Sequence, residues 1–280
     1  MRPAVSPPLT DLSDEGLVAA IEADLVAARV LAPEVPVEIH QDADATWGIA
    51  RYTDPYRSTV VSARFAAADA DRRIVEITAT IAARGTGFLW WVAPFHAPHD
   101  LGARLVCAGL QHEGTAPAMA MDLALLPRDE PLPPGLEIVP VRDEATVDEF
   151  VGVHDAEMAG ADGGANPAAR HHAALREAIP LTLADEPVPL RYVGRLDGRT
   201  VATSRIAIAA GVAGLYAVTT LPDARGRGIG RAMTLAALSA GHELGYRIAV
   251  LQSSDEGLPV YRRIGFRTLF DYEVYQHRLE

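Results

Sequence analysis

The spacing of apolar residues in the second half of the chain predicts alternating strands and helices. Alternating apolar and polar positions indicate strands, and apolar residues three or four positions apart indicate helices. The dipeptide Asp197-Gly198 separates two apolar runs and predicts a tight hairpin turn. The predicted order is strand 135–143, helix 144–158, a Gly/Ala/Asp loop at 159–166, helix 167–179, strands 190–198, 199–211 and 213–221, helix 227–244, strand 246–252, helix 256–265 and strand 267–277.

The first half has a weaker pattern. A helix is expected over 14–31, and another over 71–85, where Ile74, Ile77 and Ile81 share one face. After it the sequence predicts a strand over 88–94, a short helix over 99–110 and a strand over 117–125.

Prolines and charges interrupt the apolar pattern between Leu125 and Ile138, which predicts a linker. We place a boundary there, dividing the chain into domains 1–134 and 135–280. Both parts end with a strand, a short helix closing on glycine, and a strand, so we interpret the chain as a diverged tandem repeat. The fold class expected for each part is α/β or α+β, with helices covering a central sheet.

Composition narrows the functional classes. Of 280 residues, 49% are hydrophobic and 22% charged, which is typical of a globular protein. The formal charge of −12 argues against nucleic acid as a partner and mildly favours a cationic or amine-bearing one. Neither a membrane span nor a signal segment is recognised, so a cytoplasmic location is expected, with no membrane partner.

Two further counts limit the chemistry. All 25 basic residues are arginine, which excludes a Schiff-base lysine mechanism. The single cysteine, Cys107, cannot form an internal disulfide, and its apolar surroundings predict a buried side chain. His171 and His172 are adjacent on a predicted helix and face different directions, so no metal site is expected.

The most informative stretch is "VTTLPDARGRGIGRAM", Val218 to Met233, where a strand passes into a helix. The first backbone N–H groups of a helix lack intrahelical partners and form an anion site together with the positive helix end. Gly228 and Gly230 let a phosphate approach the backbone closely, and Arg225, Arg227 and Arg231 can bind phosphate oxygens. The stretch lacks the Lys-Ser/Thr pair of a P-loop and the spacing of a dinucleotide-binding motif.

The spacing instead resembles that of the GCN5-related N-acetyltransferases. Their acetyl-CoA motif, Gln/Arg-x-x-Gly-x-Gly/Ala, is matched by Arg225-Gly226-Arg227-Gly228-Ile229-Gly230. The resemblance implies that these amides bind the pyrophosphate of acetyl-CoA, and that Val218, Thr219 and Thr220 pair with the pantetheine arm. It implies no metal.

The family's tyrosine in a short helix closing with Gly-Phe is matched by "VYRRIGF", which gives Tyr261, Gly265 and Phe266. The resemblance implies direct acetyl transfer to an amine, with Tyr261 as the acid for the leaving thiolate. Where the family often has an asparagine that contacts the coenzyme, seven residues before the tyrosine, this chain has Ser254. A phenol with a pKa of about 10 is a weaker acid than a thiol near 8.5, and Arg262 and Arg263 would ease the transfer if they pointed toward Tyr261.

The first half resembles a degenerate copy of the same domain. "RGTGFL" at 84–89 looks like the motif, but it is predicted to follow a helix and precede a strand, the reverse of the required order. Leu105 stands where the second half has Tyr261, and it cannot donate a proton. We therefore expect one coenzyme site per chain.

Several points stay open at the level of sequence. An ammonium must lose its proton before it attacks, and the candidates for the base are His154, Glu157, Asp255 and Glu256. Tyr216 is compatible with an acceptor pocket or with ordinary strand packing. The acceptor is expected to be the amine of a small molecule, with the negative charge of the chain favouring a cationic one, and the protein is expected to be a monomer or homodimer. Alternatives are a mycothiol-synthase-like acetyltransferase and a non-catalytic module that responds to coenzyme A.

Overall fold

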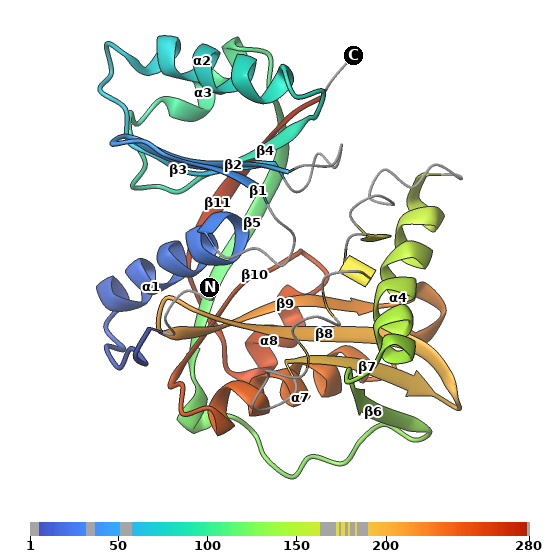
Figure 1. Cartoon of the computed structure of the whole chain (residues 1–280). Coiled ribbons are helices and arrows are strands. Elements are labelled where there is room, and N and C mark those ends of the chain that lie inside the picture. The colour runs from blue at the N-terminus through green and yellow to red at the C-terminus, as the bar shows by residue number, and fades with distance from the viewer. Residues whose placement is uncertain are drawn as a thin grey trace.

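A computed structural model describes residues 6–31, 37–50, 58–162, 172–173, 175–176, 179, 183 and 190–278. Within this part of the chain, helices cover both faces of a mixed, mostly antiparallel sheet (Figure 1). The first half contributes α1 (Asp14–Val26), the π-helical turn η1 (Ala27–Leu31), β1 (Val37–Gln41), β2 (Ala45–Ala50), β3 (Thr59–Ala63), α2 (Ala70–Ala82), β4 (Phe88–Val92), α3 (Leu101–Cys107), β5 (Gln111–Asp122) and the 3-10 turn η2 (Leu123–Leu125).

The second half follows after a segment, 126–135, that carries neither helix nor strand. Its elements are β6 (Leu136–Pro140), α4 (Glu144–Asp162), β7 (Arg191–Leu196), β8 (Arg199–Ala209), β9 (Val212–Thr220), the 3-10 turn η3 (Pro222–Ala224), α7 (Ile229–Glu243), β10 (Ile248–Gln252), α8 (Leu258–Ile264) and β11 (Arg267–His277).

Most of the predicted elements are confirmed, and β11 has the predicted bounds. Three strands of the first half, β1, β2 and β3, were not predicted. The predicted helix 167–179 lies mostly outside the described residues, although His172, Ala173, Leu175 and Arg176 are helical.

The two halves exchange their last strands. The eleven described strands form one sheet in the order β1-β2-β3-β4-β11-β5-β10-β9-β8-β7-β6. β11, from the second half, pairs with β4 of the first, while β5, from the first half, pairs with β10 of the second. β5 and β11 pair with each other and run lengthwise between the two lobes (Figure 1).

This order has an approximate twofold symmetry about the β5–β11 pair. The only two parallel pairs among the described strands are β3–β4 and β9–β10, and each is paired at two positions. The order strand, helix, strand occurs in β4-α3-β5 and again in β10-α8-β11, as the sequence repeat predicts. The division into domains 1–134 and 135–280 stays a prediction, and the sheet joins strands from both sides of it.

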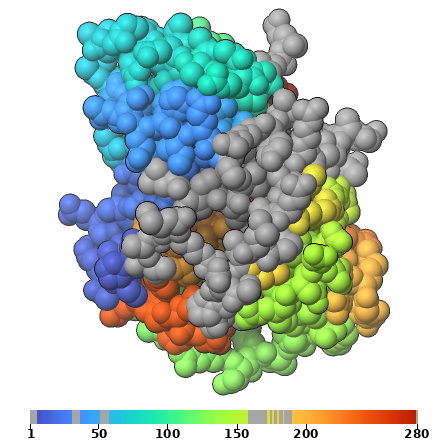
Figure 2. Space-filling model, in the orientation of Figure 1, coloured from blue at the N-terminus to red at the C-terminus, as the bar shows by residue number. Residues whose placement is uncertain are grey.

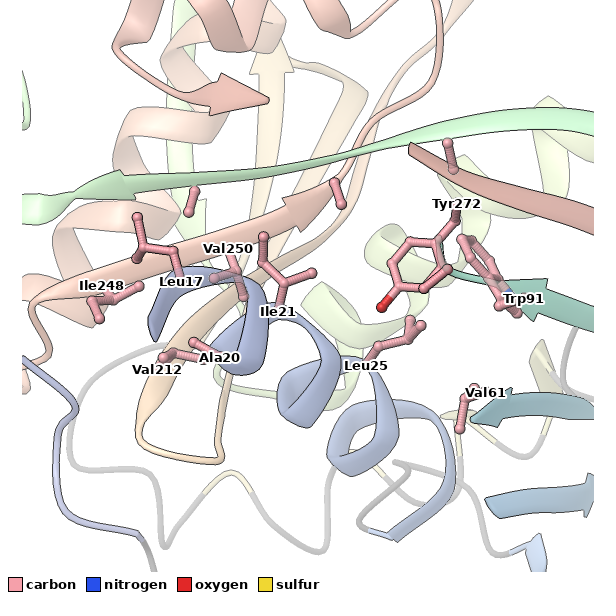
Figure 3. Packing of buried hydrophobic residues seen from close by; sticks show 14 of the residues in the cluster. Leu17, Ala20, Ile21, Leu25, Val61, Trp91, Val212, Ile248, Val250 and Tyr272 are labelled. Atoms are coloured by element: carbon pink, nitrogen blue, oxygen red, sulfur yellow. The ribbon is translucent and has the colours of Figure 1, made fainter. Parts of the chain in front are cut away.

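Helix α1 packs against strands of both halves. Ser13 caps it by accepting a hydrogen bond from the Gly16 N–H at 3.1 Å. In Figure 2, α1 lies beside residues of the second half, below the lobe that holds β1–β4, α2 and α3. Its apolar face points at β9, β10 and β11 and at the end of β3 (Figure 3), in a cluster that includes Leu17, Ala20, Ile21, Leu25, Val61, Val212, Val250 and Tyr272.

One carboxyl group lies on this apolar face. Asp24 is completely buried, and its Oδ2 accepts a hydrogen bond of 2.6 Å from the Tyr216 hydroxyl on β9. Gly214 makes room for it, because an added Cβ would lie 2.6 Å from both carboxylate oxygens. Burial raises the pKa of Asp24 to about 7, against the opposing effects of Tyr216 and of two arginines. The Tyr216 hydroxyl therefore takes part in the contact between α1 and β9, which belong to different halves.

Cys107 corrects one expectation, since its side chain is exposed. Helix α3 has only seven residues, and only Leu101 and Leu105 of them are buried. Val106 and Cys107, at the end of the helix, therefore face solvent, and the apolar pattern around Cys107 does not extend to its own position.

The buried Asp24 predicts a pH dependence of stability. A carboxyl whose pKa is raised by folding binds its proton more tightly in the native state, so between its ordinary value of 3.8 and about 7 the free energy of unfolding falls as pH rises. Asp24→Asn removes this effect. In urea denaturation at pH 4.5 and pH 8, we expect the variant to gain a few kcal/mol relative to wild type at the higher pH.

Asp271→Asn, at an exposed position of β11, is the control and should follow the wild-type pH dependence. Parallel stability curves for wild type and Asp24→Asn across this range would contradict the assignment.

Candidate active site

The candidate site begins where β9 and β10 separate. They pair only at Ala213 with Ala249 and at Gly214 with Val250, whereas β9 continues to pair with β8 as far as Thr220. The β10-facing edge of β9 after Gly214 thus has no partner among the described strands. A register shift in β8–β9 coincides with Ala217, whose φ of 51° is unusual for a residue with a side chain.

A cavity of about 820 Å³ opens in this gap. It is lined by the end of β9, by the glycine loop before α7 (residues 225–228), by the first turn of α7 and by the region of α8. The cavity contains every residue that the sequence predicts for the coenzyme except Arg227, together with the predicted acid. These residues are Val218, Thr219, Thr220, Arg225, Gly226, Gly228, Ile229, Gly230, Arg231, Ser254 and Tyr261.

The glycine loop, residues 225–228, contains two glycines in the left-handed region. Gly226 and Gly228 have φ values of 75° and 79°, which favour glycine. A Cβ at Gly226 would meet nothing within 4 Å, and one at Gly228 only Pro133, at 3.6 Å, so space for a ligand remains beside the backbone. Gly228 is the N-cap of α7 and makes no side-chain cap, which leaves the first N–H groups of a fifteen-residue helix available to a bound anion.

The three arginines of the motif differ in their contacts. Arg225 forms ion pairs with Glu157 at 2.7 Å and with Glu256 at 3.3 Å. Arg231 makes a bidentate pair with Glu130 of the linker, at 2.8 and 2.6 Å. Arg227 is exposed, does not line the cavity, and has no ion pair within the described part of the chain.

Tyr261 lies on α8 with its ring against Phe266, edge to face, at 5.9 Å between centroids. Among the described residues nothing forms a hydrogen bond with its hydroxyl, which therefore has free donor capacity toward the cavity. Burial raises the pKa of Tyr261 to about 12. The expected help from Arg262 and Arg263 is absent, because both side chains are exposed and neither lowers this pKa.

Ser254 lines the cavity, but its hydroxyl oxygen also has a local role. It accepts a hydrogen bond from the Gly257 N–H at 3.2 Å, and the Ser254 carbonyl accepts one from the Leu258 N–H at 3.0 Å. Ser254 thus shapes the turn into α8, and its hydroxyl proton remains available to a ligand.

Two of the four base candidates lie on α4 beside β9. His154 is 3.3 Å from the Thr203 hydroxyl through Nε2 and 3.5 Å from the Thr219 hydroxyl through Nδ1. The Thr203 hydroxyl donates to the Ala217 carbonyl at 2.8 Å, so it can only accept from Nε2–H. The neutral ring then has Nδ1 as its basic nitrogen, on the side of Thr219 and the cavity.

Of the remaining candidates, Glu157 and Glu256 line the cavity and both bind Arg225. Asp255 is exposed and does not line it. The sequence indicated the carboxylates but not their pairing with Arg225, since residues 157 and 225 lie on different elements.

Arg263 lines the cavity, while the linker contacts the glycine loop and α7 without lining it, and the sequence predicted neither contact. Pro133 and Glu130 reach the glycine loop and α7 from the segment between the halves, and Arg263 lies on the exposed side of α8. No local pattern identifies such contacts, because they arise where distant segments pack.

The corresponding gap in the first half is closed. β3 and β4 pair at two positions, as β9 and β10 do, but beyond them the Ala97 backbone occupies the free edge of β3. The Phe65 N–H donates to the Ala97 carbonyl at 2.9 Å, and the Ala97 N–H to the Ala63 carbonyl at 3.2 Å. Residues 64–69, between β3 and α2, include no glycine. "RGTGFL" lies between α2 and β4, in the reverse context that the sequence predicted.

Comparisons with known proteins identify a similar domain and a similar fold. Residues 190–268 match the family model described as an acetyltransferase (GNAT) domain. A GCN5-related N-acetyltransferase from Kribbella flavida is similar in structure, with a TM-score of 0.65 and 20% identity over 97% of this chain and 98% of that one. A tandem GNAT protein from the clavulanic acid biosynthesis pathway has a TM-score of 0.56 and 13% identity, covering 97% of each chain.

A third similar structure is a GCN5-related N-acetyltransferase from Sphaerobacter thermophilus, with a TM-score of 0.58 and 18% identity over 84% of this chain and 77% of that one. No curated protein matches the sequence.

Residues 190–268 thus match a GNAT acetyltransferase domain, which covers the glycine motif and α8. The chain as a whole has the fold of GCN5-related N-acetyltransferases, including one with a tandem arrangement. Within the described residues, no helix is long and apolar enough to span a bilayer.

Proposed function

We propose that this protein transfers the acetyl group of acetyl-CoA directly to the amine of a small molecule. The observation that carries the proposal is the cavity, which is lined by the end of β9, the glycine loop at the start of α7 and Tyr261. Within the described part of the chain, this edge of β9 has no strand partner and the Tyr261 hydroxyl has no hydrogen-bond partner. These elements supply backbone groups for an extended chain, a site for an anion and a proton donor. The domains 1–134 and 135–280 are proposed as a coenzyme-free copy and a catalytic copy.

Acetyl-CoA fits these residues in extended form. Val218, Thr219 and Thr220 offer the backbone edge along which the pantetheine arm would pair as an added strand. The amides near Gly228 would hold the pyrophosphate. Bound there, acetyl-CoA supplies an activated acyl thioester.

Tyr261 is proposed to act as a donor to the leaving sulfur. With a pKa of about 12 it is neutral at every physiological pH and always carries its proton. Complete transfer to a thiolate of pKa about 8.5 would be uphill by roughly 5 kcal/mol at about 1.36 kcal/mol per pKa unit. The phenol therefore stabilises the developing negative charge mainly through a hydrogen bond.

The acceptor amine also has to lose a proton. The Thr219 hydroxyl lines the cavity and lies 3.5 Å from His154 Nδ1. We propose that this hydroxyl relays the proton from the amine to the ring. The formal charge of −12 favours an acceptor that arrives as a cation. We propose such an amine as the acceptor class.

Gly228→Glu tests the coenzyme site. The added carboxylate would stand at the N-terminus of α7, where the pyrophosphate is expected. In isothermal titration calorimetry, the Kd for acetyl-CoA should rise by about a hundredfold or more, equivalent to about 2.7 kcal/mol.

Gly245→Glu is a matched control, because Gly245 also has positive φ, at 85°, and lies beyond the other end of α7. Wild-type affinity in Gly228→Glu would exclude this site.

Tyr261→Phe tests the donor. Thiol release from acetyl-CoA with an amine library should identify an acceptor for wild type, and with that amine the variant should lose about a hundredfold in kcat. The KM for acetyl-CoA should change little. Tyr246→Phe, at a buried position after α7, controls for the loss of a phenol. Turnover of Tyr261→Phe within twofold of wild type would remove the assignment.

A further inference from the structure

Arg225 is held across the cavity by partners from three elements. Its Nη2 pairs with Glu157 Oε1 of α4 at 2.7 Å, and its Nη1 with Glu256 Oε2, before α8, at 3.3 Å. Its Nε donates to the Thr220 carbonyl at the end of β9, at 2.9 Å. All three nitrogens of the guanidinium are thus occupied by the protein's own oxygens.

These partners occupy the cavity that the coenzyme requires. Glu157, Glu256, Thr220 and Arg225 all line it, and Arg225 is the first residue of the glycine motif. A pyrophosphate bound at that motif would bring two negative charges beside these carboxylates. Sharing one guanidinium among carboxylates and phosphate is unfavourable because like charges repel, so the phosphate and the glutamates compete for Arg225.

Glu157 is the more consequential of the two glutamates. Its Oε1 binds Arg225, while its Oε2 is buried and accepts no hydrogen bond within the described residues. The Glu256 side chain, by contrast, is 77% exposed and can be hydrated. When Arg225 leaves, Glu157 becomes a partly buried carboxylate without a counter-ion, which favours the binding of a cation.

We propose that coenzyme binding draws Arg225 from Glu157 to the pyrophosphate, and that the released Glu157 carboxylate then binds the ammonium group of the acceptor. This inference rests on the proposed function and extends it to a site for the acceptor's ammonium group that forms only after the coenzyme has bound. Acetyl-CoA binds first, and the ammonium site forms as a result. Glu157 positions the amine beside Thr219, and the acceptor is a cation when it arrives.

Coenzyme affinity tests the exchange of partners without requiring the natural acceptor. Glu157→Gln removes the principal competitor for Arg225, so calorimetry should give a Kd for acetyl-CoA about two- to fivefold lower than wild type, the range that a partly exposed ion pair supports. Asp148→Asn is the matched control. It removes one negative charge from the same helix, where Asp148 pairs with Arg176 outside the cavity, and its Kd should equal that of wild type.

A double-mutant cycle with Arg225→Gln isolates the interaction. The gain from Glu157→Gln should disappear when Arg225 is absent. An unchanged or weaker affinity in Glu157→Gln, an equal gain in Asp148→Asn, or a gain that persists without Arg225 would overturn the exchange. If wild type binds no acetyl-CoA at all, the proposed function itself fails, which is a distinct result.

The ammonium site has its own probe. n-Butylammonium chloride, titrated against backbone amide spectra, should give saturable shifts near Thr219 in the complex with coenzyme A and much weaker ones in the coenzyme-free protein. Glu157→Gln should abolish the saturable shifts while retaining coenzyme binding. Saturable binding that persists in Glu157→Gln, or no saturable binding to the complex, would overturn the assignment of Glu157.

Discussion

The separation of β9 from β10 is the constraint on which the site depends. Among the described strands, β9 and β10 pair at only two positions, so the backbone N–H and C=O groups on this edge of β9 have no sheet partner beyond Gly214. Such groups are costly to bury unless a ligand or water satisfies them, so the gap must either bind an extended molecule or be filled by the chain. The cavity, the glycine loop and Tyr261 all lie around this gap.

The two halves of the protein differ in how the gap beside the parallel strands is treated. In the second half the gap stays open, and the first turn of α7 faces it across two left-handed glycines. In the first half the Ala97 backbone takes the place of a ligand by bonding to Ala63 and Phe65. The exchanged strands β5 and β11 and the apolar face of α1 fix the halves against each other. The first half thus contributes packing and the Asp24–Tyr216 contact, and we propose that it holds no second site of the same kind.

Local patterns predicted much of this arrangement, because they depend on residues close in sequence. The apolar spacing was enough to predict a helix over 229–243 and a strand over 267–277. The change from strand to helix near Arg225 could also be predicted without knowledge of distant contacts. Strands β1–β3 were missed because short strands of mixed polarity have no distinctive period. The sequence could not predict that β5 and β11 each pair with a strand of the other half. Both halves end in the order strand, helix, strand, and that order is the same whichever strands the last one pairs with.

The same limit applies to the site. The motif identified most of the residues that line the cavity, but it could not identify their partners. Arg225 pairs with Glu157 and Glu256, and Arg231 with Glu130, because packing brings these distant segments together. The direction of the Tyr261 pKa shift also depends on burial by neighbouring elements, and the adjacent arginines in the sequence suggested the opposite shift.

The number of coenzyme molecules bound per chain tests the central claim most directly. Isothermal titration calorimetry of the full chain with acetyl-CoA should give a stoichiometry near one, because the proposed coenzyme site lies in the gap between β9 and β10, while the Ala97 backbone closes the corresponding gap beside β3. A stoichiometry near two would show that the first half also binds the coenzyme, and would contradict the account of a closed gap at Ala97.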